Sequence, residues 1–154
     1  MGNTVKSAIS VLFLVAGVCL NAHAQQQNEV VSKYGKANGN FIGAVAVKMY
    51  TDAKTGLNCS VGSVSFEAGA RSKWHKHPGG QMLMVTEGKG FYQERGKPKK
   101  VILKGDFISC LPNVEHWHGA ADDSSMTHVA IGPNVDQGAV TWLEHVTDAV
   151  YLQK

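Results

Sequence analysis

The sequence predicts an all-β domain, built as a sandwich or barrel of short strands. From residue 59 onward, apolar and β-branched runs recur at short, regular intervals, and turn-forming residues separate them. Several of these runs alternate with the period of two that a strand requires. The spacing leaves no room for the crossover helices of βαβ units, so a parallel α/β sheet is excluded.

Residues 1–24 are expected to be a signal peptide and not part of this domain. Lys6 supplies a positive amino-terminal region, residues 8–20 form an apolar run, and Ala-His-Ala at residues 22–24 is a small-x-small cleavage site. The apolar run is too short to span a bilayer comfortably. We expect cleavage after Ala24, a periplasmic or secreted mature protein and no stable membrane insertion. An uncleaved amino-terminal anchor is the alternative.

The mature chain suits one domain with a single core, because cleavage after Ala24 leaves 130 of the 154 residues. It carries 14 basic and 12 acidic side chains, and so small an excess does not favour nucleic acid or an anionic membrane as a partner. The expected partner is a small molecule. Cys59 and Cys110 lie on separate predicted strands, where we expect two buried free thiols. A disulfide is the alternative in an oxidising compartment.

The mature chain begins with an arm that precedes the domain. Residues 25–40 are polar and have no period of two or of 3.6, which predicts a flexible arm ahead of a single domain over residues 41–154. Residues 41–50 are apolar and β-branched, and they predict the first strand. Residues 51–58 predict a loop.

The remaining elements are short strands. The strand predicted over residues 59–67 alternates, which places Gly62, Val64 and Phe66 on one face. Residues 81–86 predict a strand that is apolar on both faces, as in the wall of a sandwich or barrel. A turn is expected at residues 87–90, and further strands are expected over residues 91–93, 99–103, 106–111, 116–119, 126–131 and 140–146, before a terminal helical turn at residues 147–152.

Two histidines separated by one residue, His75 and His77, are candidate metal ligands. If residues 74–77 are extended, both side chains project from the same face and can converge on one ion. A Pro-Gly-Gly turn follows, and the amide oxygen of Gln81 returns toward the two imidazoles at the start of the next strand. His116 is a candidate further along the chain. For an isolated motif of this kind, a satisfied pair of core histidines is the alternative.

The wider spacing of these residues resembles the two motifs of the cupin family. The first motif is matched by Gly69, His75, His77, Gln81 and Gly88, and the second by Gly105, Asp106, Pro112 and His116. Gln81 stands where glutamate is common, and the usual glycine shortly after the proline is absent. The resemblance implies a single-domain cupin fold, a double-stranded β-helix or jelly-roll β-barrel. It also implies one divalent metal ion held by His75, His77, Gln81 and His116.

A narrower resemblance rests on four phrases, WHKHPGGQ, EHWHGA, MTHVAI and WLEHVTD. They are similar to the manganese-dependent cupins with hydroxynitrile lyase activity, and to relatives found beside carboxymuconolactone decarboxylase domains. The resemblance implies manganese as the metal, with iron next, and zinc is also compatible with nitrogen and oxygen donors. It further implies a homo-oligomer, either a dimer or a tetramer.

Two further histidines are candidates for acid–base catalysis. Three imidazoles and one amide leave the charge of a divalent ion uncompensated, so the site should be electrophilic. His118 lies two residues after His116 and is the first candidate, with orientation of a metal ligand as its alternative role. His128 matches a cavity-facing histidine of the lyase-like cupins, and a satisfied core histidine is its alternative role.

The expected function is that of a metal-dependent lyase. The metal acts as a Lewis acid on a hydroxyl or carbonyl oxygen, while His118 or His128 moves the hydroxyl proton. A carbon–carbon bond of a small hydroxynitrile, or of a similar hydroxy or carbonyl compound, then breaks or forms. Gly62, Val64 and Phe66 are expected to shape the substrate pocket.

Two other functions would use the same residues. A metal-dependent dioxygenase of a phenol, enol or diketone needs no additional side chains. A non-catalytic periplasmic cupin would bind a small acid or sugar, with Trp74, Trp117 and Met84 lining an apolar pocket. The two tryptophans are otherwise expected in the core.

Overall fold

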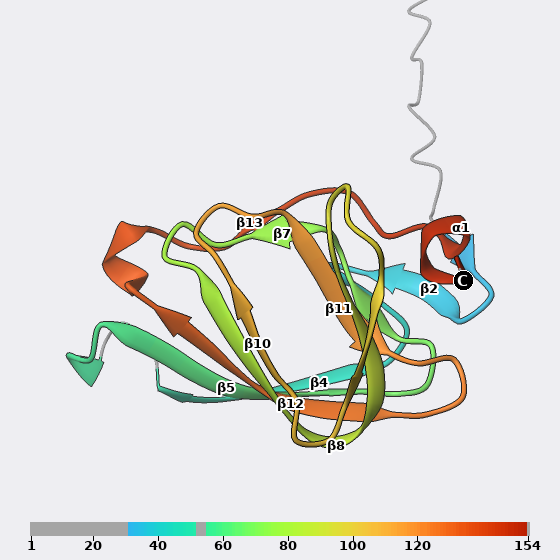
Figure 1. Ribbon diagram of the computed structural model, residues 1–154, viewed down its shortest axis with the longest axis horizontal. Coiled ribbons are helices and arrows are strands. Elements are labelled where there is room, and N and C mark those ends of the chain that lie inside the picture. The colour runs from blue at the N-terminus through green and yellow to red at the C-terminus, as the bar shows by residue number, and fades with distance from the viewer. Residues whose placement is uncertain (1–30, 52–54, 154) are drawn as a thin grey trace, which may run out of the picture.

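Thirteen strands and one short α-helix dominate residues 31–51 and 55–153, which the computed structural model describes (Figure 1). The strands are β1 (Val31–Ser32), β2 (Gly35–Asn38), β3 (Phe41–Ile42), β4 (Val45–Thr51), β5 (Cys59–Phe66), β6 (Arg71–Ser72), β7 (His75–Lys76), β8 (Gln81–Glu94), β9 (Lys100–Leu103), β10 (Phe107–Cys110), β11 (His116–Ala120), β12 (Met126–Pro133) and β13 (Thr141–Trp142). The helix is α1 (Asp148–Tyr151), and a 3-10 turn, η2, spans Val135–Gln137. The all-β prediction is confirmed. Across the described residues, no helix has the length and apolar character needed to cross a membrane.

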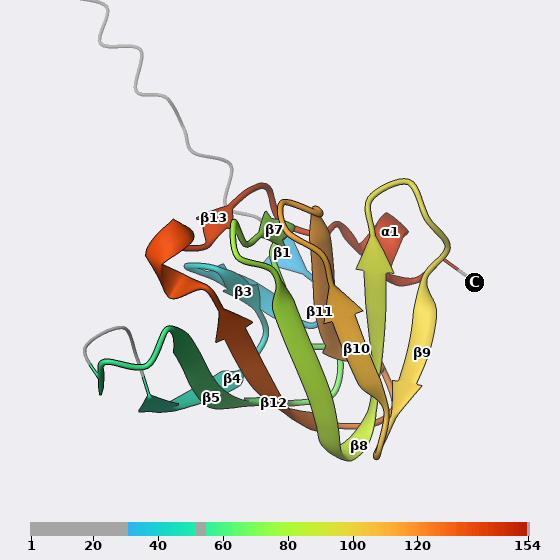
Figure 2. The same ribbon diagram turned by 60° about the vertical axis from the view of Figure 1, so that its left-hand side comes forward.

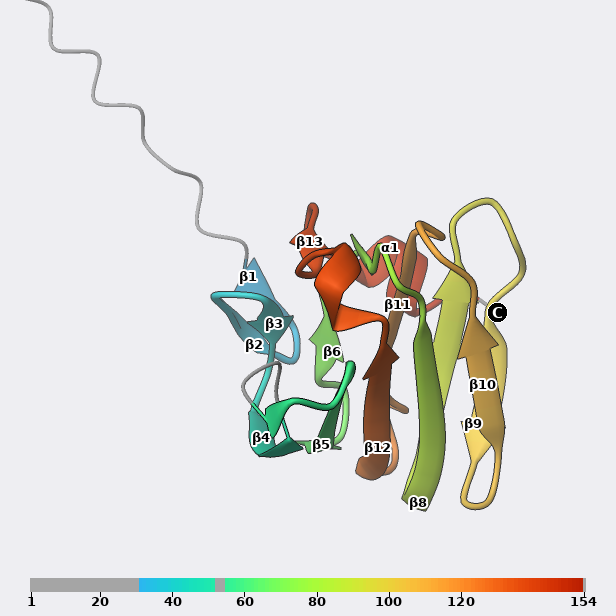
Figure 3. The ribbon, with the colours of Figure 1, turned by 90° about the vertical axis from the view of Figure 1, so that its left-hand side faces the viewer.

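The strands belong to one sheet that curls on itself. Its main order is β1-β2-β3-β6-β11-β8-β12-β5-β4, and β9, β10, β7 and β13 pair at its sides. Figure 1 shows β10 and β11 on opposite sides of a shared interior, and Figure 3 shows β4 and β5 at one end with β9 and β10 at the other. The curled sheet therefore encloses one interior, into which alternate residues of each strand project.

The long strand β8 joins the two halves of this curled sheet. Its first half pairs with β12 and β10, and its second half pairs with β11 and β9, as Figure 2 shows from the side. The predicted turn at residues 87–90 is therefore wrong. The backbone bends there without leaving the sheet, because Gly88 has a φ of 74° and the register with β12 shifts nearby. A Cβ at Gly88 would lie 2.0 Å from the backbone oxygen of Ser125, so only glycine fits.

The interior is packed by side chains from alternate strand positions. Gly62, Val64 and Phe66 are buried along β5, and Leu83 and Val85 are buried along β8, which confirms the predicted faces. Burial of an aromatic or aliphatic side chain of this size contributes about 1.5–3 kcal/mol. A second, smaller core lies against α1 and contains Trp74, Trp117, Val146 and Tyr151.

Two predicted strands are shorter in the structure than in the prediction. Gly43, with a φ of 81°, divides the strand predicted over residues 41–50 into β3 and β4. The strand predicted over residues 140–146 is confirmed only at β13. The residues after β13 continue beside Trp74, whose carbonyl accepts from the Leu143 N–H at 2.8 Å. The helical turn predicted near the carboxyl end is confirmed as α1, and the hydroxyl of Thr147 caps it.

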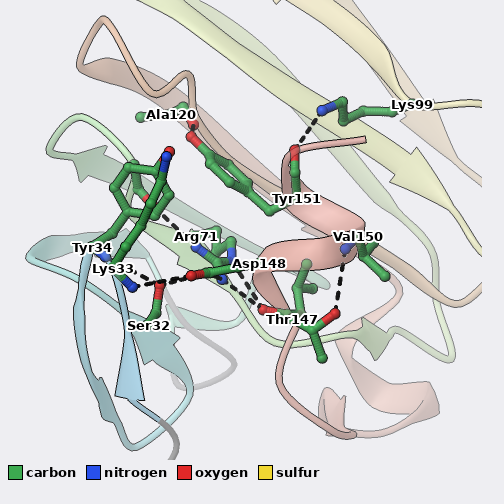
Figure 4. A network of polar contacts seen from close by, with 12 residues as sticks. Ser32, Lys33, Tyr34, Arg71, Lys99, Ala120, Thr147, Asp148, Val150 and Tyr151 are labelled. Carbon is green, nitrogen blue, oxygen red and sulfur yellow. Dashed lines mark hydrogen bonds and ion pairs between the residues drawn. The ribbon is translucent and has the colours of Figure 1, made fainter. Parts of the chain in front are cut away.

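The flexible arm predicted over residues 25–40 is wrong for residues 31–40. These residues include β1 and β2, and Asp148 of α1 holds them: its carboxylate accepts from the Ser32 hydroxyl at 2.6 Å and from the Lys33 N–H at 3.0 Å (Figure 4). The Tyr34 ring packs edge-on against Tyr151, with 5.2 Å between ring centroids. The sequence of residues 31–40 has no strand periodicity. Contacts with α1, which is more than 100 residues away in the sequence, hold this segment in place. Residues 25–30 and the predicted signal peptide, residues 1–24, lie outside the described residues.

Candidate metal centre

The candidate metal centre lies where β7, β11 and β13 meet the start of β8. His75 of β7 is the register partner of His116 of β11, and Trp142 of β13 is the register partner of His75 on the other side. After β7, the chain turns at residues 78–80, where the Gly80 N–H donates to the carbonyl of His77 at 3.2 Å. Gln81 then begins β8. The turn brings the amide of Gln81 back toward the histidines, as the sequence predicts.

Three histidines form a cluster of possible metal ligands among the described residues. Ligand nitrogens of His75, His116 and His118 all lie within 4.8 Å of one another, and all three residues are buried. The His75 and His116 rings are 4.2 Å apart between centroids, and the His75 and His118 rings are 5.2 Å apart. His118, predicted as an acid–base group, therefore lies as close to the other two histidines as a ligand would.

The remaining predicted ligands border this cluster. The amide oxygen of Gln81 lies 2.9 Å from Nε2 of His116. The His77 ring lies farther out, with centroids 5.3 Å from His75 and 5.8 Å from His116. Nε2 of His77 is buried and has no hydrogen-bond partner in the structure. The structure thus brings the four predicted ligands to one place and adds His118 to them.

Burial keeps these imidazoles neutral. It lowers the pKa of His75 well below the ordinary value of 6.5, and the neighbouring His116 lowers it further. Burial likewise lowers the pKa of His116, and it lowers the pKa of His77 to about 4 together with the influence of His116. A metal binds the unprotonated nitrogen of an imidazole, so neutral rings at pH 7 are in the state that metal binding needs.

Backbone carbonyls fix which ring nitrogen carries the proton. Nδ1 of His75 lies 2.9 Å from the carbonyl oxygen of Lys73, and Nδ1 of His116 lies 3.0 Å from that of Val114. A carbonyl only accepts, so each Nδ1 must donate its proton, and each Nε2 is left with a lone pair. Nε2 of His116 then lies 2.9 Å from the amide oxygen of Gln81. Both atoms carry lone pairs, and no proton is available between them.

These residues fit one divalent metal ion. A cation satisfies both the His116 nitrogen and the Gln81 oxygen, and it also gives a partner to the orphaned Nε2 of His77. Imidazole nitrogen and amide oxygen are donors that manganese, iron and zinc all accept, so the donor set does not identify the metal. No carboxylate lies among the described residues that line the adjoining cavity, so nothing there neutralises the charge of the ion.

A second pair of histidines extends from the cluster into the protein. Nδ1 of His118 lies 3.2 Å from Nε2 of His128, and the outer nitrogens of both rings, Nε2 of His118 and Nδ1 of His128, are buried without partners. Burial lowers the pKa of His118 well below its ordinary value and lowers that of His128 to about 4. Both rings are therefore neutral, and one proton lies between Nδ1 of His118 and Nε2 of His128. Phe66 packs against both of them, with ring centroids 5.7 Å from each.

A cavity of about 230 Å³ opens beside His75, His77, Gln81 and His118. Gly62 and Val64 line it, as the sequence predicts. Phe66 does not line it, and lies behind the His118–His128 pair. His128 is fully buried and also does not line the cavity, so it can act on a cavity ligand only through His118.

Part of the apolar wall of this cavity was not predicted from the sequence. Phe41, Val47, Met49 and Trp142 line it, although they come from β3, β4 and β13. The Trp142 ring lies 4.9 Å from the His75 ring and 5.8 Å from the Phe41 ring between centroids. Trp142 belongs to the phrase WLEHVTD, which was a usable signal. The residues from β3 and β4 carry no motif that could have identified them.

Three aromatic or apolar residues considered for a binding pocket do not form one. Trp74 and Trp117 are buried in the second core, and Met84 is 42% exposed on the outer surface. Cys59 and Cys110 are both free, as the sequence predicts, but only Cys110 is buried and Cys59 is half-buried. A larger surface depression lies around Lys97 and Lys99, away from the histidines, and lacks the convergent donors of the metal centre.

Comparison with known sequences agrees with this architecture. A family profile described as a cupin domain matches residues 62–132. A protein named (R)-mandelonitrile lyase from Granulicella tundricola is 44% identical over 111 residues, which cover 72% of this chain and 85% of that protein.

Solved structures show the same likeness. A cupin-like protein from Thermotoga maritima superposes with a TM-score of 0.73 at 49% identity, over 79% of this chain and 92% of that chain. A DMSP lyase from Ruegeria pomeroyi superposes with a TM-score of 0.56 at 16% identity, over 68% of this chain and 56% of that chain. At so low an identity, the second likeness shows the fold alone.

Proposed function

The chain belongs to the cupin family, and from that premise we propose that it is a metal-dependent lyase that cleaves or forms the carbon–carbon bond of a small hydroxynitrile. One observation carries the proposal: His118 borders the cavity beside the convergent ligand atoms, and its Nε2 has no partner while its Nδ1 contacts His128. A proton acceptor thus lies next to the place where an electrophilic ion would sit. The 44% identity to a protein named (R)-mandelonitrile lyase supports this reaction class.

The metal centre is assigned to His75, His77, Gln81 and His116. A divalent ion held there supplies Lewis acidity toward a hydroxyl or carbonyl oxygen. We propose manganese, on the likeness to the manganese-dependent lyases, with iron and zinc as the alternatives that the same donors accept. Because all four side chains are neutral, they leave the charge of the ion available to an anionic or lone-pair ligand from the cavity.

His118 moves the proton in this reaction. In the cleavage direction, Nε2 of His118 takes the hydroxyl proton of the hydroxynitrile, and the electrons of the O–H bond form the carbonyl of an aldehyde or ketone. The carbon–carbon bond breaks, its electron pair leaves with cyanide, and the proton returns from His118 to cyanide as hydrogen cyanide. His128 supports the step because its Nε2 lies 3.2 Å from Nδ1 of His118 and can exchange the second proton of the ring.

The cavity walls hold the organic part of the substrate. Phe41, Val47, Val64 and Trp142 present apolar surface, and the volume of about 230 Å³ suits a small molecule. Water expelled from such a wall strengthens the electrostatic interactions at the histidines. A hydroxynitrile with a compact apolar or aromatic substituent fits this environment better than a polyhydroxylated one.

The test is cyanide release in the absence of oxygen. Protein loaded with manganese is incubated with mandelonitrile, and benzaldehyde and cyanide are measured anaerobically. His118→Ala should lose at least about 100-fold in turnover, the contribution expected of a general base, and retain its metal. The control is His145→Ala, which removes a half-buried histidine outside the cavity lining and should retain activity.

Three outcomes overturn the proposal. Oxygen uptake with a phenol, enol or diketone, without anaerobic cyanide release, would assign a dioxygenase. Saturable binding of a small acid or sugar without turnover would assign a binding protein. Full activity of His118→Ala would show that another group moves the proton.

Export and self-association are part of the same proposal. Cleavage after Ala24 would place the mature enzyme in the periplasm or outside the cell. β4 is an edge strand that exposes Val47, Met49 and Tyr50, each by more than half, which gives two copies an apolar reason to associate. Analytical ultracentrifugation of the mature protein should give the mass of a dimer or tetramer, and a monomer at micromolar concentration would contradict this part.

A further inference from the structure

Cys110 contacts the metal centre from the protein interior. Its Sγ lies 3.0 Å from Nδ1 of His116, and the residue is 5% exposed. Cys110 of β10 is also the register partner of Gln81 of β8. One pair of neighbouring strand positions therefore contacts both nitrogens of the same imidazole, the sulfur at Nδ1 and the amide oxygen at Nε2.

The hydrogen-bond chemistry around this sulfur is specific. The proton on Nδ1 of His116 has two acceptors, the carbonyl oxygen of Val114 at 3.0 Å and the sulfur of Cys110. The thiol hydrogen has its own acceptors, because Sγ lies 3.8 Å from the carbonyl oxygens of Leu111 and Val114. The sulfur can therefore turn a lone pair toward Nδ1–H while it donates its hydrogen to the backbone.

The surroundings keep the sulfur in this role. Tyr92 is 2% exposed, its ring lies 5.6 Å from the His116 ring, and its hydroxyl donates to Glu94 at 3.3 Å. Cys110 belongs to the main core cluster and does not line the cavity. A thiol enclosed in this way is out of reach of a substrate, so a role as nucleophile is excluded by position.

We propose that Cys110 is a positioning residue for the metal ligand His116. Its sulfur, together with the Val114 carbonyl, holds the ring in one rotation and in the tautomer that carries its proton on Nδ1. The lone pair on Nε2 then points toward Gln81 and the ion. Groups that hold a ligand histidine in this way typically change metal affinity 10- to 100-fold when they are removed. The inference rests on the metal ligands of the proposed function and not on the reaction.

The first test compares metal affinity in matched cysteine variants. Manganese dissociation constants are measured by chelator competition for the wild type, Cys110→Ala, Cys110→Ser and Cys59→Ala. We expect Cys110→Ala to weaken binding about tenfold and Cys110→Ser to recover part of the loss, since a hydroxyl also accepts from Nδ1–H. Cys59→Ala removes the other free thiol of the described residues, which does not line the cavity, and should bind manganese as the wild type does.

Two spectroscopic readouts separate positioning from general destabilisation. The visible spectrum of the cobalt-substituted protein should shift in Cys110→Ala and not in Cys59→Ala, because only the former changes a ligand ring. In the metal-free protein, the ¹⁵N resonances of the His116 ring should shift in the same variant, whereas those of the His145 ring, which does not line the cavity, should not. Circular dichroism is used to check that each variant is folded. If Cys110→Ala does not fold, the same measurements are made on Cys110→Ser.

Failure of this inference is distinguishable from failure of the proposed function. Unchanged affinity, cobalt spectrum and His116 resonances in both Cys110 variants would overturn the role of Cys110 and leave the lyase proposal intact. A wild type that binds no divalent metal would overturn both. Altered affinity in a protein that releases no cyanide would support Cys110 and overturn the lyase.

Discussion

Replacement of Asp148 by asparagine should destabilise the protein strongly, although Asp148 does not line the cavity. Its carboxylate lies 2.6 Å from the guanidinium of Arg71, which is fully buried (Figure 4). Arg71 also donates to the carbonyl of Val146 from Nε at 3.0 Å and from a terminal nitrogen at 2.9 Å. The same carboxylate accepts from Ser32 and Lys33, so the substitution loosens β1 and α1 and leaves a buried cation without a counter-ion.

The expected loss is about 2–3 kcal/mol in the free energy of unfolding. Removing one partner of a fully buried ion pair costs about 3–5 kcal/mol. The Asp148 side chain is 32% exposed, so water screens part of its interaction, and the Val146 carbonyl remains as an acceptor for Arg71. For a domain of this size, the loss corresponds to a fall in Tm of about 6–12 °C.

The assay is chemical denaturation at pH 7, with Asp123→Asn as the matched control. Asp123 pairs with Lys89 at 2.8 Å, but its side chain is 64% exposed and that of Lys89 is 37% exposed. An exposed pair contributes about 0–1 kcal/mol, so the control should unfold near the wild-type midpoint. A loss below about 1 kcal/mol for Asp148→Asn, equal to that of the control, would refute the argument that a buried guanidinium depends on this carboxylate.

The same ion pair predicts a pH dependence. Burial by itself would raise the pKa of Asp148, but hydrogen bonds from Ser32, Lys33 and Arg71 outweigh it and hold the pKa below its ordinary value of 3.8. A carboxyl with a depressed pKa in the folded state contributes its full stability above that ordinary value. The difference between wild type and Asp148→Asn should therefore be constant near pH 7 and shrink as the pH falls below 3.8. A difference that grows in acid would contradict the assignment.

Three further predictions concern the metal centre and the cavity. Gln81→Glu should bind manganese at least as tightly as the wild type but turn over mandelonitrile at least about tenfold more slowly, because a carboxylate cancels part of the ion's charge. Faster turnover than the wild type at equal metal content would contradict this prediction. Removal of the metal by a chelator should lower Tm, and manganese at 100 times its dissociation constant should restore about 2.7 kcal/mol in calorimetry; an unchanged Tm would argue against a folded-state metal site. Gly62→Val should raise KM for mandelonitrile, because its Cβ would lie 2.6 Å from Sδ of Met49 and the displaced side chain narrows the cavity. Met49→Ala in that background should lower KM again, and a KM that stays at the wild-type value in Gly62→Val would show that this wall does not contact substrate.

The strand pattern was predictable because it depends on local sequence. Alternation along β5 and the start of β8 identified the buried faces from residue types alone, and the structure confirms both. Errors arose where a bend or a contact overrides local preference. The Glu-Gly-Lys-Gly stretch has the composition of a turn. The strand β8 nevertheless continues through it, because β12 pairs with β8 before the bend and β9 pairs with β8 after it.

The candidate site was predictable for a different reason. Spacing alone brought His75, His77 and Gln81 together, since period two and one tight turn determine which way those side chains point. His118 and His128 were predicted only as separate acid–base candidates, and their contact was not predicted because it depends on the arrangement of β11 and β12. Cys110, Phe41 and Trp142 were not identified as site residues at all.

The all-β class, the strand faces and the convergence of His75, His77 and Gln81 could be predicted from the sequence, because they follow from short-range geometry. The sequence also carried the motifs that mark the chain as a cupin. Three features became visible only in the folded protein: the order of residues 31–40, the position of Phe66 behind the histidine pair, and the contact between Cys110 and His116. Each of these depends on strands distant in sequence that lie against one another when the sheet curls, and no local pattern encodes that contact.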